Sequence, residues 1–334
     1  MMNKQKLYSI ALISTAMILI LVSIVGAAPF AYITDQDSSN VSVINTATNN
    51  ITAIISANTL NNPYGVAVTP DGKKAYVTNL NGNTVSVINT TANTVTTTMP
   101  VGNGPFGVAV TPDGEKAYVT NSDDDTVSVI NTKTNTVITM VPVGNVPFGV
   151  AVTPDGKKVY VTNCDDGTVS VINTKTNTVT STVPVGNGPF GVAVTQDGIN
   201  VYVTNNYDYP GDVSVINTKT NTVTDTVFVG TGPSGVAITP DGTNIYVANS
   251  DDDTVSVINT TTNTVTSTVP VGFVPRRVTV TPDEKKVYVA NSQSNTISVI
   301  NTAKNRVIAT VPGGTWPIAF GQFIGNIQIK PKIT

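Results

Sequence analysis

Runs of aspartate are the first feature of this sequence that can support chemistry. Carboxylate oxygens are ligands that Ca²⁺ prefers, and short runs of Asp recur at three places along the chain. Consecutive aspartates in one short turn cannot all converge on one ion, and the calcium-loop spacing DxDxDG does not occur. The runs therefore predict solvated turns, with a weak Ca²⁺ site between adjacent acidic turns as the alternative. These residues are Asp123, Asp124, Asp125, Asp165, Asp166, Asp251, Asp252 and Asp253.

A second set of residues follows a proline that recurs along the chain. The residue after this proline is aromatic four times, then Ser234, and then the first of the pair Arg276-Arg277. Aromatic rings beside guanidinium groups can hold a sugar, a carboxylate or a partner's loop. The alternative is that the rings only fill the gaps between neighbouring structural units. The candidate binding residues are Tyr64, Phe106, Phe148, Phe190, Arg276 and Arg277, with Tyr207 and Tyr209 of a longer loop expected on the same face.

The composition excludes several kinds of active site. The chain has no histidine, which removes a Ser-His-Asp triad and the usual zinc ligand sets. Its only glutamates are Glu115 and Glu284, and its one cysteine, Cys164, stands where other repeats have serine. Three GxGxxG strings carry proline at the fourth position and precede strand patterns, whereas a dinucleotide site needs a helix there. These features favour a protein without enzymatic activity or a cofactor.

The elements that position these residues form a sevenfold repeat. One tyrosine recurs at positions 32, 76, 118, 160, 202, 246 and 288, in steps of 42 or 44 residues. Each repeat contains four short runs rich in Val, Ile and Thr and bounded by Gly, Pro, Asn or Asp, for example 149–153, 158–162, 168–173 and 178–185. That pattern is typical of strands joined by tight turns. It predicts an all-β fold, a seven-bladed β-propeller of four-stranded antiparallel blades.

The ends of the repeat region predict how the ring closes. The first repeat begins at 31–35 and lacks an inner strand, whereas the last run, 316–325, resembles an inner strand with nothing after it. We expect the C-terminal strand to complete the first blade, which removes open sheet edges. The predicted domains are a signal peptide or N-terminal membrane anchor (1–28), the propeller (29–325) and a C-terminal tail (326–334).

The repeated motifs resemble those of the YVTN-type β-propeller family. The strings YVTN, PDG, VSVINT and TVPVG recur over roughly residues 30–325. The family includes archaeal surface-layer and cell-surface proteins, so the resemblance implies an extracellular seven-bladed propeller. It implies no catalytic residue, because the shared motif is the scaffold itself.

Charge and targeting signals agree with export. Lys4 and Lys6 precede an uncharged apolar run, 7–25, and small residues follow it; this is the pattern of a signal peptide or an N-terminal anchor. The net charge of −3 makes nucleic acid a poor partner. Acidic turns and lysine-rich turns should lie on opposite faces of the disc. Glycosylation sequons occur at Asn40, Asn50, Asn89 and Asn259.

Three functions remain open at this stage. The first is an exported, non-enzymatic binding or structural protein of the cell surface, with a cell-envelope protein or glycan as partner and no membrane contact beyond the N-terminal segment. The second is an extracellular lactonase-like or metal-assisted hydrolase. The third is a lattice subunit whose oppositely charged faces stack. For the first, we expect alanine at both Arg276 and Arg277 to weaken anion binding and leave the fold intact.

Overall fold

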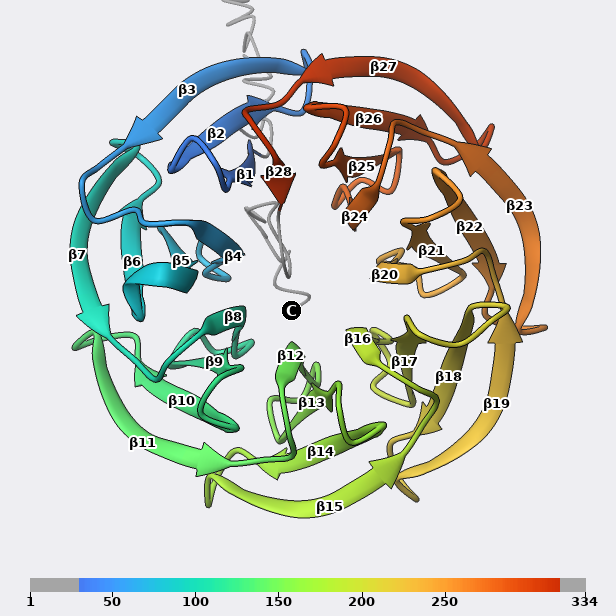
Figure 1. Cartoon of the computed structure of the whole chain (residues 1–334), viewed down its shortest axis with the longest axis horizontal. Helices are drawn as coiled ribbons and strands as arrows, with labels where there is room; N and C mark the ends of the chain where they lie inside the picture. The colour runs from blue at the N-terminus through green and yellow to red at the C-terminus, as the bar shows by residue number, and fades with distance from the viewer. Residues whose placement is uncertain (1–29, 319–334) are drawn as a thin grey trace, which may run out of the picture.

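The computed structural model describes residues 30–318 and shows seven four-stranded antiparallel sheets arranged in a ring around a central axis (Figure 1). The predicted seven-bladed propeller is therefore confirmed. Within these residues the one helical element is the 3₁₀ turn η1 (Leu80–Gly82). No helix in this range is long and apolar enough to cross a membrane. The expected signal or anchor (1–28), residues 319–325 and the expected tail (326–334) lie outside the described residues.

Each blade runs from an inner strand beside the axis to an outer strand at the rim (Figure 1). Blade 1 contains β28 (Pro317–Ile318), β1 (Phe30–Asp35), β2 (Asn40–Asn45) and β3 (Asn50–Ser56). Blade 2 contains β4 (Pro63–Val68), β5 (Lys74–Asn79), β6 (Thr84–Asn89) and β7 (Thr94–Pro100), and blade 3 contains β8 (Pro105–Val110), β9 (Lys116–Asn121), β10 (Thr126–Asn131) and β11 (Thr136–Pro142). Blade 4 contains β12 (Pro147–Val152), β13 (Lys158–Asn163), β14 (Thr168–Asn173) and β15 (Thr178–Pro184), and blade 5 contains β16 (Pro189–Val194), β17 (Asn200–Asn205), β18 (Asp212–Asn217) and β19 (Thr222–Phe228). Blade 6 contains β20 (Pro233–Ile238), β21 (Asn244–Asn249), β22 (Thr254–Asn259) and β23 (Thr264–Pro270), and blade 7 contains β24 (Pro275–Val280), β25 (Lys286–Asn291), β26 (Thr296–Asn301) and β27 (Arg306–Pro312).

The turn residues explain why the chain reverses where it does. In blade 4, Thr153 donates a hydrogen bond from its hydroxyl to Asp155 at 2.7 Å, and Gly156 has a φ of 71° that suits glycine. The hairpin between the third and fourth strands uses asparagine in the left-handed region, as at Asn177 with a φ of 52°. The recurrence of these turns fixes the strand length in every blade.

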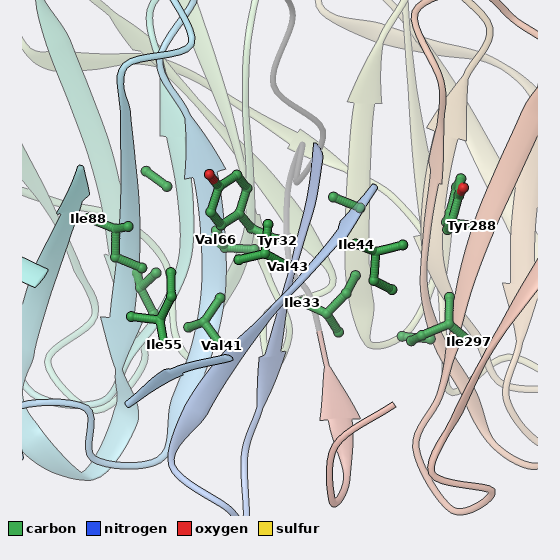
Figure 2. Close-up of a cluster of buried hydrophobic side chains, with 14 of the residues drawn as sticks. Tyr32, Ile33, Val41, Val43, Ile44, Ile55, Val66, Ile88, Tyr288 and Ile297 are labelled. Carbon is green, nitrogen blue, oxygen red and sulfur yellow. The ribbon is translucent and has the colours of Figure 1, made fainter. Parts of the chain in front are cut away.

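The hydrophobic core lies between neighbouring blades. Figure 2 shows the cluster around blade 1, in which Ile33 and Val41 meet side chains of blades 2 and 7 such as Val66 and Ile297. The repeat tyrosines are the largest buried side chains. Each tyrosine hydroxyl donates a hydrogen bond to the left-handed asparagine of the next blade, as Tyr118 does to Asn177 at 3.1 Å. Apolar packing and this polar ring together join the blades.

The strands closing the ring come from opposite ends of the described chain. β28 pairs with β1 through Thr34 opposite Ile318 and Asp35 opposite Pro317. On the other side of the same blade, Tyr288 of blade 7 donates to Asn49 at 2.6 Å. The expectation that a C-terminal strand completes the first blade is therefore confirmed.

Candidate functional site

Four aromatic rings meet at the axis instead of filling separate gaps between blades. The ring centroids of Tyr64 and Phe106 lie 3.9 Å apart, those of Phe106 and Phe148 4.4 Å, and those of Phe148 and Phe190 4.8 Å. Phe106 also reaches Phe190, two blades away, at 5.8 Å. Rings from non-neighbouring blades can touch only across the axis. We call these four rings, together with Ile318, Arg277 and the neighbouring Arg276, the cap.

The repeat sequence places each ring at the axis through the glycine that follows it. A Cβ added at Gly149 would lie 2.4 Å from the carbonyl oxygen of Phe190 in the next blade. Glycine therefore lets the inner strands approach closely. The amide of Gly149 donates to the Thr162 hydroxyl at 2.7 Å, and that hydroxyl donates to the Phe190 carbonyl at 2.9 Å. The threonine joins adjacent blades directly below the cap.

Blade 7 departs from this pattern and carries arginines at the aromatic and glycine positions. Arg277 takes the place of the glycine and is 4 % exposed. In blades 2 to 6 a β-bulge leaves the glycine without a partner on the second strand, whereas Arg277 pairs with Ala290. Its guanidinium carbon lies 4.6 Å from the Phe190 ring centroid and 6.0 Å from that of Tyr64, within the range of a cation–π contact. Its Nη1 donates to the carbonyl of Arg276 at 2.8 Å. Burial lowers the pKa of Arg277 to about 9, so the guanidinium stays charged at neutral pH.

The neighbouring blade 6 adjusts to this departure. Its second strand has Ala248 where blades 1 to 5 have the joining threonine. Ser234, at the aromatic position of blade 6, is fully buried and donates its hydroxyl to the carbonyl of Arg276 at 3.0 Å. In blade 6, the Ser234 hydroxyl of the first strand thus makes the contact to the next blade that the second-strand threonine makes elsewhere, as Thr162 does in blade 4.

The two arginines differ in accessibility, so we expect their removal to cost the fold different amounts. Arg277 is buried in the cap, whereas Arg276 is half-buried and lies nearer the surface, as Phe148 and Phe190 do. Burial raises the pKa of the Tyr64 phenol, and the positive charge of Arg277 opposes this effect. The reachable part of the cap therefore combines Arg276 with two partly exposed aromatic rings.

Tyr207 and Tyr209 lie in the longer loop between β17 and β18 and are 67 % and 89 % exposed. Neither takes part in the ring contacts of the cap. The Tyr207 ring packs over Gly188, and its hydroxyl forms a hydrogen bond with the thiol of Cys164, whose pKa is raised mainly by burial. The structure thus separates this tyrosine pair from the aromatic cluster.

The aspartate runs hold the inter-blade linkers in place. Within one run, Asp124 accepts a hydrogen bond from the amide of Asn103 in the preceding linker at 2.7 Å. Asp125 accepts from the amide of Val146 in the following linker at 2.9 Å. Neighbouring carboxylates therefore point toward different linkers. The corresponding hydrogen bonds in the other runs join Asp166 to Asn145, Asp252 to Thr231 and Asp253 to Val274. The first aspartate of two runs accepts a hydrogen bond from the preceding serine instead, Asp123 from Ser122 and Asp251 from Ser250. Asp165 is exposed.

The divergent directions of the aspartate side chains matter for the expected Ca²⁺ site. Across residues 30–318, no group of three or more Asp, Glu or Cys side chains is placed to hold a metal ion. Binding of Ca²⁺ stays a prediction, as does modification of the sequon asparagines. Asn50 and Asn89 are exposed, Asn259 is half-buried, and the Oδ1 atom of Asn40 is buried.

Two residues in this region were missed by sequence reasoning. Asp35 is fully buried in β1, where six other blades have asparagine, so its departure from the repeat was a readable signal. Trp316 lies half-buried beside the cap and donates its amide to Asn295 at 2.8 Å. The sequence pattern predicts Trp316 only as part of the strand 316–325.

The arrangement defines the class of protein as a seven-bladed β-propeller with a closed aromatic centre. The chain belongs to the YNCE-like beta-propeller family, whose sequence model matches residues 106–205 and 237–323. The resemblance to YVTN-type propellers is confirmed at this level, whereas the archaeal surface-layer assignment finds no support in the comparisons. No curated protein matches the chain in sequence.

Solved structures share the fold at low sequence identity. A functionally unknown protein from Desulfotomaculum acetoxidans has a TM-score of 0.76 at 18% identity, covering 88% of this chain and 99% of that one. A putative 6-phosphogluconolactonase from Bacteroides uniformis has a TM-score of 0.73 at 19% identity, with 87% and 98% covered. Hydrazine synthase from Kuenenia stuttgartiensis has a TM-score of 0.55 at 21% identity, with 72% and 96% covered. At these identities the likeness concerns the fold alone.

Proposed function

We propose that this chain is an exported, non-enzymatic binding protein of the cell envelope that recognises acidic saccharides at its cap. The observation that carries the proposal is the break in sevenfold symmetry at Arg276 and Arg277. In one blade only, guanidinium groups replace the aromatic and glycine residues, and they do so beside the aromatic rings. Because a purely structural ring has no need for this exception, we infer that it serves a ligand.

The chemistry of the reachable surface suggests the ligand. Arg276 offers a planar donor group that matches a carboxylate. The partly exposed rings of Phe148 and Phe190 offer apolar faces of the kind that the C–H face of a sugar covers. A uronic acid unit presents both features within one residue. Export is proposed from the apolar run at 7–25 and places such a protein beside envelope glycans.

The test is a calorimetric titration of the purified full chain with galacturonate and, separately, with galactose. We expect heat of binding for the acid and at least tenfold weaker binding of the neutral sugar, because only the acid engages Arg276. Binding of the acid should weaken as salt is added, since the contact at the surface is screened. Equal affinity for both sugars, or no binding of either, would overturn the proposal.

A hydrolase is the second candidate, and the structural neighbour described as a putative 6-phosphogluconolactonase favours it. Against it, both glutamates lie in turns on the lysine-rich face, far along each inner strand from the cap. We expect no turnover of 6-phosphogluconolactone by the purified protein. The hydrolase would be established instead by turnover faster than the reaction without protein, provided that this turnover disappears when bound metal is removed and returns when Ca²⁺ is added.

A further inference from the structure

A buried carboxyl group lies at the one place where the two ends of the ring pair. Asp35 is 0 % exposed and ends β1, directly opposite Pro317 of β28. Its Oδ1 accepts a hydrogen bond from the amide of Gly314 at 3.0 Å, and its Oδ2 accepts one from the Ser42 hydroxyl at 2.6 Å. Asp35 therefore joins β1 to β2 and to the linker that leads into β28. We define the seam as β1, β28 and the linker 313–316.

The other six blades have asparagine at this position, and their amide makes contacts that a carboxylate cannot make. In blade 4, Nδ2 of Asn163 donates to the hydroxyls of Thr168 and Ser170, while its Oδ1 accepts from the Gly144 amide. An ionised carboxyl has no proton to donate. Asn40 lies opposite Asp35 in the register, and its buried Oδ1 has no hydrogen-bond partner within the described chain. An ionised Asp35 thus lacks the amide donor that the other six blades have at this position.

Among residues 30–318, no charged side chain lies against the carboxylate. The elements packed against it present Asn40 and Ser42 from β2, Gly314 from the linker and Pro317 from β28, none of which ionises. The nearest carboxyl in the sequence is Asp37, which is exposed in the following turn. Burial raises the pKa of Asp35 to about 6, against the opposing effect of the hydrogen bonds from Ser42 and Gly314.

We propose that Asp35 is a proton-operated latch: its protonated form closes the seam, and its ionised form loosens β28 and the linker. The proton supplies the donor that the asparagines of the other blades carry permanently. Blade 7 also lacks the joining threonine, having Ala290 in its place, so the inner seam depends more on this contact. The latch goes beyond the proposed ligand and does not require it.

The latch is connected to the cap through two neighbouring contacts. Ile318, the residue after Pro317, is 2 % exposed and belongs to the cap. On the adjacent strand, the Thr34 hydroxyl donates to the carbonyl of Tyr64 at 2.6 Å. Loosening of the seam therefore changes the packing of the rings that form the proposed binding surface.

The chain provides its own probe for this proposal. Trp316, its one tryptophan, lies in the linker two residues from Gly314, and its carbonyl accepts from the amide of Gln36 at 3.2 Å. We would titrate the tryptophan fluorescence of the full chain from pH 4 to pH 8. The chain has no histidine, and Asp212, the other carboxyl whose pKa burial raises, lies in blade 5.

The expected result is a fluorescence transition with a midpoint near pH 6 that is absent from Asp35→Asn and retained in Asp212→Asn. Amide hydrogen exchange, corrected for its intrinsic pH dependence, measures the equilibrium constant for opening of the seam. We expect this constant to increase by up to ~100-fold from pH 4 to pH 8, because each unit of pKa shift changes it by a factor of ten. The matched control is Asn121→Asp, which introduces the same carboxyl into blade 3. It should make exchange in β8 and β9 pH-dependent and leave the Trp316 transition unchanged.

A transition that persists in Asp35→Asn, or exchange at the seam that is independent of pH in the wild type, would overturn the latch. If Asp35→Asn does not fold, the wild-type carboxyl can be titrated directly by carbon NMR. A value near 4 for Asp35 would then refute the proposal, and a value near 6 would support it. These measurements need no saccharide, so their failure is distinguishable from failure of the proposed function.

Discussion

Tyr288 donates a hydrogen bond to Oδ1 of Asn49 at 2.6 Å, across 239 residues of sequence. This contact is the last of seven equivalent bonds that run around the ring on the lysine-rich face. Because the series has no missing member, every blade is joined to the next by the same side chains. The other six join Tyr32 to Asn93, Tyr76 to Asn135, Tyr118 to Asn177, Tyr160 to Asn221, Tyr202 to Asn263 and Tyr246 to Asn305.

The first prediction concerns this polar ring. Tyr288→Phe keeps the buried ring but removes the hydroxyl, and should lower the free energy of unfolding by about 1 kcal/mol. Urea unfolding at pH 7 measures the effect. Tyr118→Phe is the matched control within the continuous chain and should cost about the same. If neither variant is less stable than the wild type, the ring of hydrogen bonds does not stabilise the fold.

The second prediction concerns the glycine below each aromatic residue. In Gly149→Ala, the new Cβ would meet the Phe190 carbonyl at 2.4 Å, so the inner strands must separate. We expect a loss of about 1–3 kcal/mol, the usual cost of overpacking a core. In Gly242→Asn, the new Cβ meets no atom within 4 Å and asparagine tolerates the φ of 73°. An equal effect of both variants would show that the close approach of the strands is unimportant.

The third prediction separates the two arginines. Arg277→Ala should destabilise the protein by about 2 kcal/mol or more, because it empties space within the cap. Arg276→Ala should change stability by less than about 0.5 kcal/mol, as is usual for side chains near the surface. Thermal unfolding of both variants distinguishes them. Equal stability of the two variants would contradict the different burial of these side chains.

The fourth prediction concerns pH. The folded pKa of Asp35 is about 6 and its unfolded value is near 3.8, so between these values the folded state binds more protons. The contribution of Asp35 to the free energy of unfolding is therefore most favourable below pH 3.8 and is lost as the pH rises through 6. At pH 7 the ionised group costs up to about 3 kcal/mol, as an order of magnitude.

Asp35→Asn should accordingly be more stable than the wild type at pH 7, and the difference should shrink as the pH falls toward 4. Asparagine occupies this position in six blades, so the substitution brings a side chain that the repeat already accommodates. Unfolding by urea at several pH values gives the comparison. A wild type that is more stable than Asp35→Asn at pH 7 would show that the carboxylate has a stabilising partner.

The fold was predictable because the sequence repeats its turns as well as its strands. The PDG turn and the left-handed asparagine recur with a fixed spacing, and each imposes a chain reversal that depends on nearby residues alone. Strand number, blade number and the closing strand all follow from that regularity. The runs proposed as strands agree with the observed ones to within about two residues at either end, the usual uncertainty of such boundaries.

The site was predictable only in part, because its geometry depends on contacts across the axis. The position after the repeat proline pointed to residues whose rings meet at the axis. Nothing in the spacing indicated that Phe106 would touch Phe190 two blades away, or that Arg277 would turn inward while Arg276 stays nearer the surface. The distinction arises because Arg277 takes the position of a glycine, and that position faces the neighbouring inner strand.

The most direct test of the proposed function compares two arginines on opposite faces of the disc. Galacturonate would be titrated into the wild type, Arg276→Gln and Arg306→Gln, where Arg306 begins the outer strand β27 and is exposed. We predict at least a tenfold loss of affinity in Arg276→Gln, the loss of one charged hydrogen-bonding contact, and an unchanged affinity in Arg306→Gln. Equal affinities for all three proteins would contradict recognition at the cap.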